Sequence, residues 1–240
     1  MIYVRDEDSN ELWGPTALPI REDGAPYVVR HGQGYSVFEY SSHGVSLELV
    51  QYVPLEDSIK ISRLKIRNLS ARSRHLSVTA YVEWVLGTSR GASAPFVVTE
   101  IDPDTRAMLA RNFFSADYGS RVAFADLGGR QLSWTGDRTD FLGRNGSLDN
   151  PAALASAAPL SERVGAGLDP CVAPIRRSAT RCPNRGLARA TVSDRLQRRR
   201  AGRHAGAFQR RGSMATRERP GSRPLRVGST GRPPHRHANE

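Results

Sequence analysis

Apolar residues recur at every second position through much of the segment 35–112, and this period constrains the fold more than any other feature. The stretch VSLELVQYV shows it most clearly, with apolar side chains at Val45, Leu47, Leu49 and Val53. Successive side chains of a β-strand point to opposite faces, so a period of two predicts strands with one face on a core. The segment is therefore expected to form a β-sheet.

Two neighbouring stretches continue this pattern. LSVTAYVEWVLG is expected to be one strand with six residues on one face: Leu76, Val78, Ala80, Val82, Trp84 and Leu86. SIKISRLKIRN keeps the period at Ile59 and Ile61 and resumes it at Leu64 and Ile66. This one-residue slip predicts a β-bulge.

Shorter strands are expected at residues 96–101, 107–111, 122–125 and 131–135. Turn residues separate them, such as Asp102-Pro103-Asp104 and Gly128-Gly129. Long helical periodicity is absent up to about residue 150, after which Asn150 and Pro151 are suited to begin one short helical turn. Many short strands at regular spacing indicate an all-β fold, an antiparallel sandwich.

The composition changes at about residue 172. Residues 1–170 hold 17 Arg and Lys against 21 Asp and Glu, a net charge of −4, whereas residues 171–240 hold 18 Arg against 3 acidic residues, a net charge of +15. The last seventy residues contain one aromatic residue, Phe208, and no Lys. Such a segment cannot bury enough apolar surface to offset the entropy of ordering. We therefore expect a β domain over residues 1–171 and a disordered, Arg-rich tail over 172–240.

Three interpretations of the tail are open. A nucleic-acid-binding arm would use Arg to neutralise phosphates, but such arms usually mix Lys with Arg and interleave aromatic residues, so no specific nucleic acid is expected. An inert, solvated tail is the second. The third is out-of-frame sequence, which we favour. The whole chain holds 2 Lys against 33 Arg, as a GC-rich gene would give, and a shifted frame of such a gene yields mostly Arg, Pro, Gly, Ala, Ser and His.

Motifs for metal and cofactor binding fail on inspection. DEDSN begins like a calcium loop, but Glu11 and Ala17 stand where Gly and Glu are needed. Cys171 and Cys182 form no disulfide framework and have no metal-ligand spacing to the histidines. No stretch approaches the roughly 18 to 20 apolar residues of a membrane span, and the acidic N-terminus is unlike a signal peptide. We expect no metal, no cofactor and a cytoplasmic location.

One loop carries a dense set of polar side chains. TGDRTDFLGRNGS, residues 135–147, groups six candidate contact residues for carbohydrate or phosphate: Asp137, Arg138, Asp140, Phe141, Arg144 and Asn145. Arg forks and carboxylates can bind sugar hydroxyls or phosphate. The alternative is that charge pairs fix this loop to the sandwich.

The front part resembles a known family in several phrases in the same order. These are YVRDEDSNELWGPTALPIRED, YVVRHGQGYSVFEY, LSVTAYVEWVLG, LARNFFSADYGSRVAFAD, TGDRTDFLGRNGS and RVGAGLDPC. They resemble one region of the cyclic β-1,2-glucan synthetases, of the glycosyltransferase family 36 type that is grouped with the phosphorylases of glycoside hydrolase family 94. The resemblance runs from about Tyr3 to Cys171.

The resemblance implies an N-terminal β-supersandwich followed by a linker helix and an (α/α)6 barrel. The barrel carries the catalytic acid and the phosphate-binding groups, so no position in 1–240 receives a catalytic role. It also implies β-glucan as the carbohydrate, the barrel as a partner, a possible homodimer, and a parent at the inner membrane with this module on the cytoplasmic side. On this basis Met1 is expected to start inside the sandwich, which is incomplete.

Three functions are therefore open. In the first, the chain is a sandwich that supports a missing catalytic barrel and is inactive alone. In the second, it is a stand-alone carbohydrate-binding module that uses residues 137–145. In the third, it is a nucleic-acid-binding protein that uses its basic tail. We favour the first.

Overall fold

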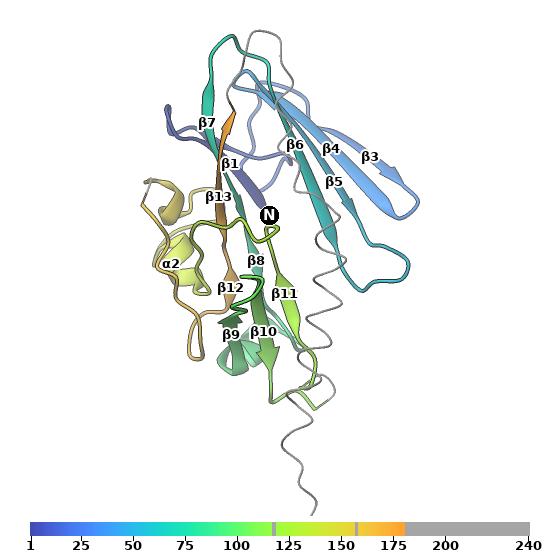
Figure 1. The fold of residues 1–240 in the computed structure, drawn as a ribbon, viewed down its shortest axis with the longest axis vertical. Coiled ribbons are helices and arrows are strands. Elements are labelled where there is room, and N and C mark those ends of the chain that lie inside the picture. The colour runs from blue at the N-terminus through green and yellow to red at the C-terminus, as the bar shows by residue number, and fades with distance from the viewer. Residues whose placement is uncertain (117–118, 157, 181–240) are drawn as a thin grey trace, which may run out of the picture. The chain divides into compact units, whose positions relative to one another are not determined.

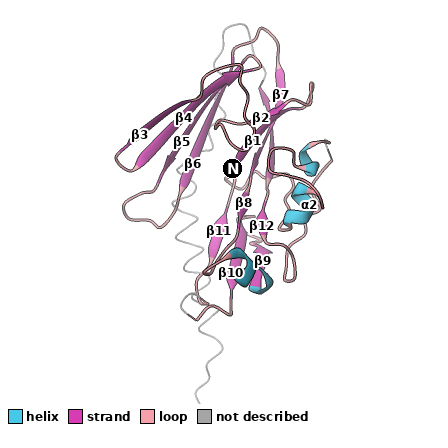
Figure 2. Ribbon diagram, turned by 180° about the vertical axis from the view of Figure 1, so that it is seen from behind, coloured by secondary structure: helices cyan, strands magenta, loops and turns pink. Residues whose placement is uncertain are grey.

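The computed structural model describes residues 1–116, 119–156 and 158–180 (Figure 1). Every strand pair in these residues is antiparallel. The helices are single turns: α1 (Arg90–Ser93), α2 (Arg138–Leu142), and the 3₁₀ turns η1 (Ala94–Phe96) and η2 (Ala152–Leu154). The all-β prediction is confirmed, and Figure 2 shows how strands dominate the described part.

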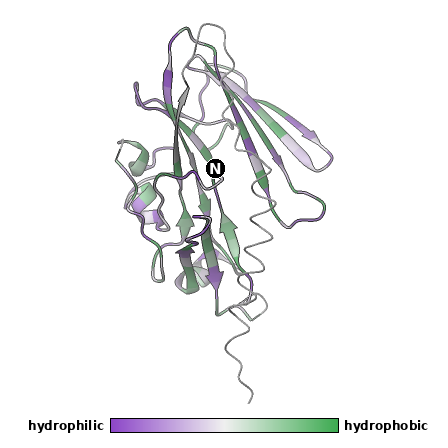
Figure 3. Cartoon of the chain, viewed as in Figure 1, coloured by the Kyte–Doolittle hydropathy of each residue, from purple (hydrophilic) through white to green (hydrophobic). Residues whose placement is uncertain are grey.

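One sheet consists of four consecutive strands joined by hairpins. They are β3 (Val28–Gly32), β4 (Tyr35–Ser42), β5 (Val45–Tyr52) and β6 (Ile61–Asn68), in that order across the sheet. Along β5 the residues Val45, Leu47 and Leu49 are buried, as the alternation predicts. Hydrophobic and hydrophilic segments both occur along these strands (Figure 3), as expected for a sheet with one face on a core.

A second sheet lies against the inner face of the first. Its order is β13 (Ile175–Thr180), β7 (Arg74–Ala80), β1 (Ile2–Asp6) and β2 (Leu12–Trp13). A core cluster joins the two sheets, with Leu47 and Leu64 from the first and Val4, Trp13 and Leu76 from the second. These side chains are 0–3% exposed, so the two sheets form a sandwich around one apolar layer.

The predicted β-bulge in β6 is wrong. The register with β5 runs without interruption from Val45↔Asn68 to Tyr52↔Ile61. Ile61 therefore faces the side opposite to Leu64 and Ile66, and it is buried there at 3% exposure. Apolar residues on both faces at one end of the strand, rather than an inserted residue, cause the slip in the pattern.

The expected single strand through LSVTAYVEWVLG is also wrong. It breaks at Tyr81 into β7 and the two-residue strand β8 (Val82–Glu83). The backbone N–H of Tyr81 donates to the Met1 carbonyl at 2.8 Å, and the chain then leaves the second sheet. Consequently Trp84 enters a different core cluster from that of Leu76, and Val82 is 42% exposed.

Smaller sheets follow this break. β8 pairs with β12 (Cys171–Val172), and β10 (Met108–Asn112) pairs with β9 (Val97–Ile101) and β11 (Ala123–Ala125). Strands β9, β10 and β11 confirm the predictions for residues 96–101, 107–111 and 122–125 within one or two residues.

Residues 131–135 form no regular strand, only an isolated bridge between Ser133 and Ile175 with flanking backbone hydrogen bonds. The helical turn predicted after Asn150 is the 3₁₀ turn η2, and Pro151 lies at its N-cap.

The strand pairing extends past the expected boundary at residue 171. β12 includes Val172, and β13 pairs with β7 from Ile175↔Thr79 to Thr180↔Arg74. Residues 172–180 thus belong to the sandwich. Among the described strands β13 lies at an edge of its sheet, a position where charged residues are commonly found. The rest of the predicted tail, 181–240, lies outside the described residues.

Candidate functional site

The loop predicted as a contact surface contains the short helix α2. Its N-cap is Asp137, whose Oδ1 accepts a hydrogen bond from the Thr139 N–H at 3.0 Å. It ends at Gly143, which has a φ of 85° that glycine adopts without strain. An Asp at the N-cap and a Gly after the last turn are standard helix signals, and they were the signal in the sequence that could have revealed this helix.

The charged residues of α2 are held by the surrounding sandwich. Asp137 pairs with Arg163 at 3.0 Å. The Nε of Arg138 donates to Glu83 at 3.0 Å, and Asp140 accepts from the Ser161 hydroxyl at 2.6 Å. This is the arrangement that the alternative interpretation of the loop predicted, with charge pairs fixing it to the sandwich.

The remaining candidates differ in accessibility. Phe141 is fully buried, its ring stacked on Tyr81 at a centroid distance of 4.8 Å and tilted against Tyr3 at 5.9 Å. Its ring therefore has no surface to offer a ligand. Arg144 and Asn145 lie in the turn after α2 and are exposed. Of the six candidates, Arg144 and Asn145 are the two whose side chains are exposed to solvent.

Arg138 belongs to a ring of four charged side chains that the sequence did not reveal. Glu83 on β8 accepts from Arg90 at 2.9 Å as well as from Arg138. Asp169 pairs with Arg90 and lies 3.7 Å from Arg138. The four residues are 28–38% exposed at their side chains. They come from three separate stretches of the sequence and meet because the fold brings β8 and α1, α2 and the approach to β12 together.

The electrostatics of these four charged side chains suit a structural role. Burial opposes ionisation of Glu83, but hydrogen bonds from Tyr81 and Arg138 outweigh it and hold the pKa of that carboxyl below its usual range. Burial, and then the hydrogen bond to Glu83, raise the pKa of Tyr81. Burial likewise raises the pKa of the Cys171 thiol. The anionic form of Glu83 is therefore favoured, as are the neutral forms of Tyr81 and Cys171.

A second titratable group joins the N-terminal loops to the turn between β4 and β5. His43 places its Nε2 2.7 Å from Glu22 and its Nδ1 3.1 Å from Glu11, and its ring lies 4.9 Å from that of Trp13. The Tyr40 hydroxyl also donates to Glu22 at 2.8 Å. Burial opposes protonation of His43, but the hydrogen bond and charge of Glu22 outweigh it and raise the pKa of the imidazole.

We expect the stability of the sandwich to fall as the pH rises through the raised pKa of His43. A group whose pKa is higher in the folded state contributes fully below its unfolded value, about 6.5, and loses that contribution as it deprotonates. His43→Gln should lower the free energy of unfolding by about 1 kcal/mol at pH 6 and by less at pH 9. Urea unfolding at both pH values measures this, with the exposed His75→Gln as the matched control. An equal loss at both pH values contradicts the prediction.

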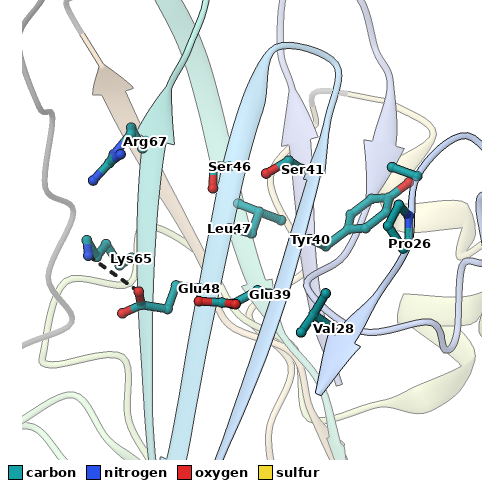
Figure 4. A pocket seen from close by; sticks show the side chains of 11 residues that line it. Pro26, Val28, Glu39, Tyr40, Ser41, Ser46, Leu47, Glu48, Lys65 and Arg67 are labelled. Atoms are coloured by element: carbon teal, nitrogen blue, oxygen red, sulfur yellow. Dashed lines mark hydrogen bonds and ion pairs between the residues drawn. The ribbon is translucent and has the colours of Figure 1, made fainter. Parts of the chain in front are cut away.

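The outer face of the first sheet carries a pocket of about 520 Å³ (Figure 4). Pro26 and Val28 form one side, and Lys65 and Arg67 of β6 form the other. The floor between them carries two carboxylates and two hydroxyls, from Glu39, Ser41, Ser46 and Glu48. None of these residues was a candidate from the sequence, because on the outer face of a strand they look like ordinary solvent-facing positions.

No helix in the described part of the chain is both long and apolar enough to cross a bilayer.

Comparison with known proteins gives a consistent family. Residues 1–178 match the family model described as "Glycosyl hydrolase 94, supersandwich domain". The chain is 38% identical over 172 residues to the cyclic beta-(1,2)-glucan synthase NdvB of Rhizobium meliloti (strain 1021), covering 72% of this chain and 6% of that protein. It is 27% identical over 161 residues to the solabiose phosphorylase of Paenibacillus borealis, covering 65% of this chain and 21% of that protein.

A third relative is the N,N'-diacetylchitobiose phosphorylase of Vibrio proteolyticus, 32% identical over 85 residues, which are 35% of this chain and 11% of that protein. The chain thus spans between 6% and 21% of the length of these relatives. The family resemblance noted in the sequence is confirmed. The chain belongs to glycosyl hydrolase family 94, and its residues 1–178 form the supersandwich domain of that family.

Proposed function

We propose that this chain is the non-catalytic supersandwich module of an enzyme that synthesises or phosphorolyses β-linked glucan, of the cyclic β-1,2-glucan synthase type. The observation that carries this proposal is the 38% identity to a cyclic beta-(1,2)-glucan synthase over 172 residues that make up 6% of that protein. In this proposal the module acts on the cytoplasmic side and supports a catalytic (α/α)6 barrel, the partner that the family resemblance implies, in a parent enzyme that can be a homodimer.

The protonation states of the module support a non-catalytic role. Phosphorolysis needs a carboxylic acid that is protonated near neutral pH, so that it can protonate the glycosidic oxygen. Among the described residues, every carboxyl group with a shifted pKa has it lowered, namely Asp6, Glu22, Glu83 and Asp149. At the first three, burial opposes ionisation, but hydrogen bonds, among them those from Arg74, His43 and Tyr81, outweigh it. The anionic form is therefore favoured at these four groups, which makes them poor proton donors.

The purified chain is expected to show no turnover. Incubation with β-1,2-glucooligosaccharides and inorganic phosphate should release no glucose 1-phosphate above the level of a heat-treated sample. A coupled assay for glucose 1-phosphate measures this, and a full-length relative with both modules is the positive control. Release that rises in proportion to the concentration of the chain would overturn the proposal.

A further inference from the structure

We infer that the pocket on the outer face of sheet β3–β6 is a binding site for neutral sugar units of a β-glucan. This inference rests on the proposed function, because it takes the glucan as the ligand that such a module meets. The site is distinct from the loop at residues 137–145, and it is built by all four strands of the sheet.

The strand register arranges the pocket as two rows. Val28, Glu39, Glu48 and Lys65 are direct partners in sequence across β3, β4, β5 and β6. Ser41, Ser46 and Arg67 form the next row, again as direct partners. Residues that are directly opposite on neighbouring strands point to the same face of the sheet. The side chains of both rows therefore lie on one surface, as Figure 4 shows.

The first row places two carboxylates at directly opposite positions of β4 and β5. Glu39 and Glu48 stand directly opposite each other, and like charges in that position destabilise a sheet. Arg30 pairs with Glu39, and Lys65 lies 3.4 Å from Glu48. The two bases reduce the repulsion, and the floor of the pocket offers two carboxylates side by side as hydrogen-bond acceptors.

The charge of the lining selects the class of ligand. Two carboxylates, Glu39 and Glu48, face two cations, Lys65 and Arg67, so the charged lining side chains sum to zero. A phosphate would meet the carboxylates, and a cation would meet Lys65 and Arg67. A neutral molecule rich in hydroxyl groups can donate to the carboxylates and accept from the cations, and Ser41 and Ser46 can do both.

Two further features suit a sugar. Arg67 is exposed, and the described part of the chain contains no carboxylate paired with it, so its guanidinium is available as a fork of donors. Pro26 and Val28 are exposed and apolar on the opposite side, where the C–H face of a pyranose ring can pack. The volume of about 520 Å³ lies within the usual range of small-ligand sites, about 300–1,000 Å³.

Isothermal titration of the full chain with β-1,2-glucooligosaccharides of defined length tests the inference. We expect saturable binding that weakens about tenfold or more in Glu48→Gln and in Arg67→Ala, because each removes a charged hydrogen bond. Arg63→Ala is the matched control, since Arg63 lies on the same strand and face but outside the pocket. It should bind like the unchanged chain, as should Arg144→Ala, and thermal melting checks that all variants are folded.

The outcomes separate this inference from the proposed function. Binding that survives Glu48→Gln and Arg67→Ala but falls in Arg144→Ala would overturn the pocket in favour of the loop. No saturable binding to the unchanged chain would also overturn it, and would leave a supporting, non-catalytic module untouched. Glucose 1-phosphate release would overturn the proposed function whatever the titration shows.

Discussion

Alanine in place of Asp6 is expected to lower the free energy of unfolding by about 3–5 kcal/mol, since it would remove the carboxylate that balances the buried charge of Arg74. The Asp6 side chain is 0% exposed, and its Oδ2 lies 2.5 Å from Nη1 of Arg74. Its Oδ1 accepts from the backbone N–H of Asp8 at 2.9 Å, and Arg74 also donates to the His43 carbonyl. One carboxylate thus connects β1, β7 and the turn between β4 and β5.

Asp6 also makes stability depend on pH at the acid end. Burial opposes its ionisation, but the hydrogen bonds from Arg74 and from the Asp8 and Ser9 backbone outweigh it and lower the pKa of the carboxyl. A group with a lowered folded pKa contributes its stability above its unfolded value, about 3.9, and loses it as the pH falls through the folded value. Acid unfolding should therefore begin as the pH falls below about 3.9 towards the lowered pKa of Asp6.

Asp8→Ala is the matched control for Asp6→Ala. Asp8 lies two residues along the chain, is 48% exposed at its side chain, and pairs with His75 at 3.1 Å. An exposed pair of this kind contributes about 0–1 kcal/mol. Urea unfolding at pH 7 gives both values. A loss below about 1 kcal/mol for Asp6→Ala would contradict the prediction and mean that the other hydrogen bonds of Arg74 suffice.

The sequence predicted those strands that have one face on the core and one in solvent. β5 was predicted well because Val45, Leu47 and Leu49 all face the same apolar layer. The prediction failed where a strand changes its surroundings. Tyr81 and Trp84 lie close in sequence, yet they enter different core clusters. A period of two cannot reveal this, because both surroundings require apolar residues.

The end of the domain was placed too early because composition was used as a guide to strand pairing. The arginines of IRRSAT suggest solvent, but β13 is an edge strand whose ladder depends on backbone groups. Family similarity extends to residue 178, in agreement with this pairing.

The candidate site was predicted only in part for a similar reason. Sequence proximity grouped six residues around Phe141, whereas the partners of Arg138 are Glu83 and Asp169, 55 and 31 positions away. The pocket on the outer sheet face depends on register across four strands, β3 to β6. Strand register is set by turns and packing, which a single sequence predicts only weakly. The row of Glu39, Glu48 and Lys65 could therefore not be found from the spacing of residues along the sequence.

Phe141→Ala should be as destabilising as Asp6→Ala, by about 3–5 kcal/mol, because it opens a cavity in a closed core. Phe141 is 0% exposed and packs between Tyr3 of β1, Tyr81 and Leu154 of η2 within one core cluster. Removal of the ring would therefore loosen the contact between the sandwich and the helical loop that covers it. Displacement of α2 should then also break the hydrogen bond between Arg138 and Glu83.

Phe114→Ala is the matched control for this substitution, since the same side chain is removed from a position that is 77% exposed. Its effect should stay within about 0.5 kcal/mol. Thermal and urea unfolding of both variants distinguish the two interpretations of residues 135–147. If Phe141→Ala unfolds like the unchanged chain, its ring is dispensable to the core, and the prediction is contradicted. If it is strongly destabilised, the loop is part of the core, and sugar binding must be sought on exposed side chains such as Arg144 or in the pocket around Glu48.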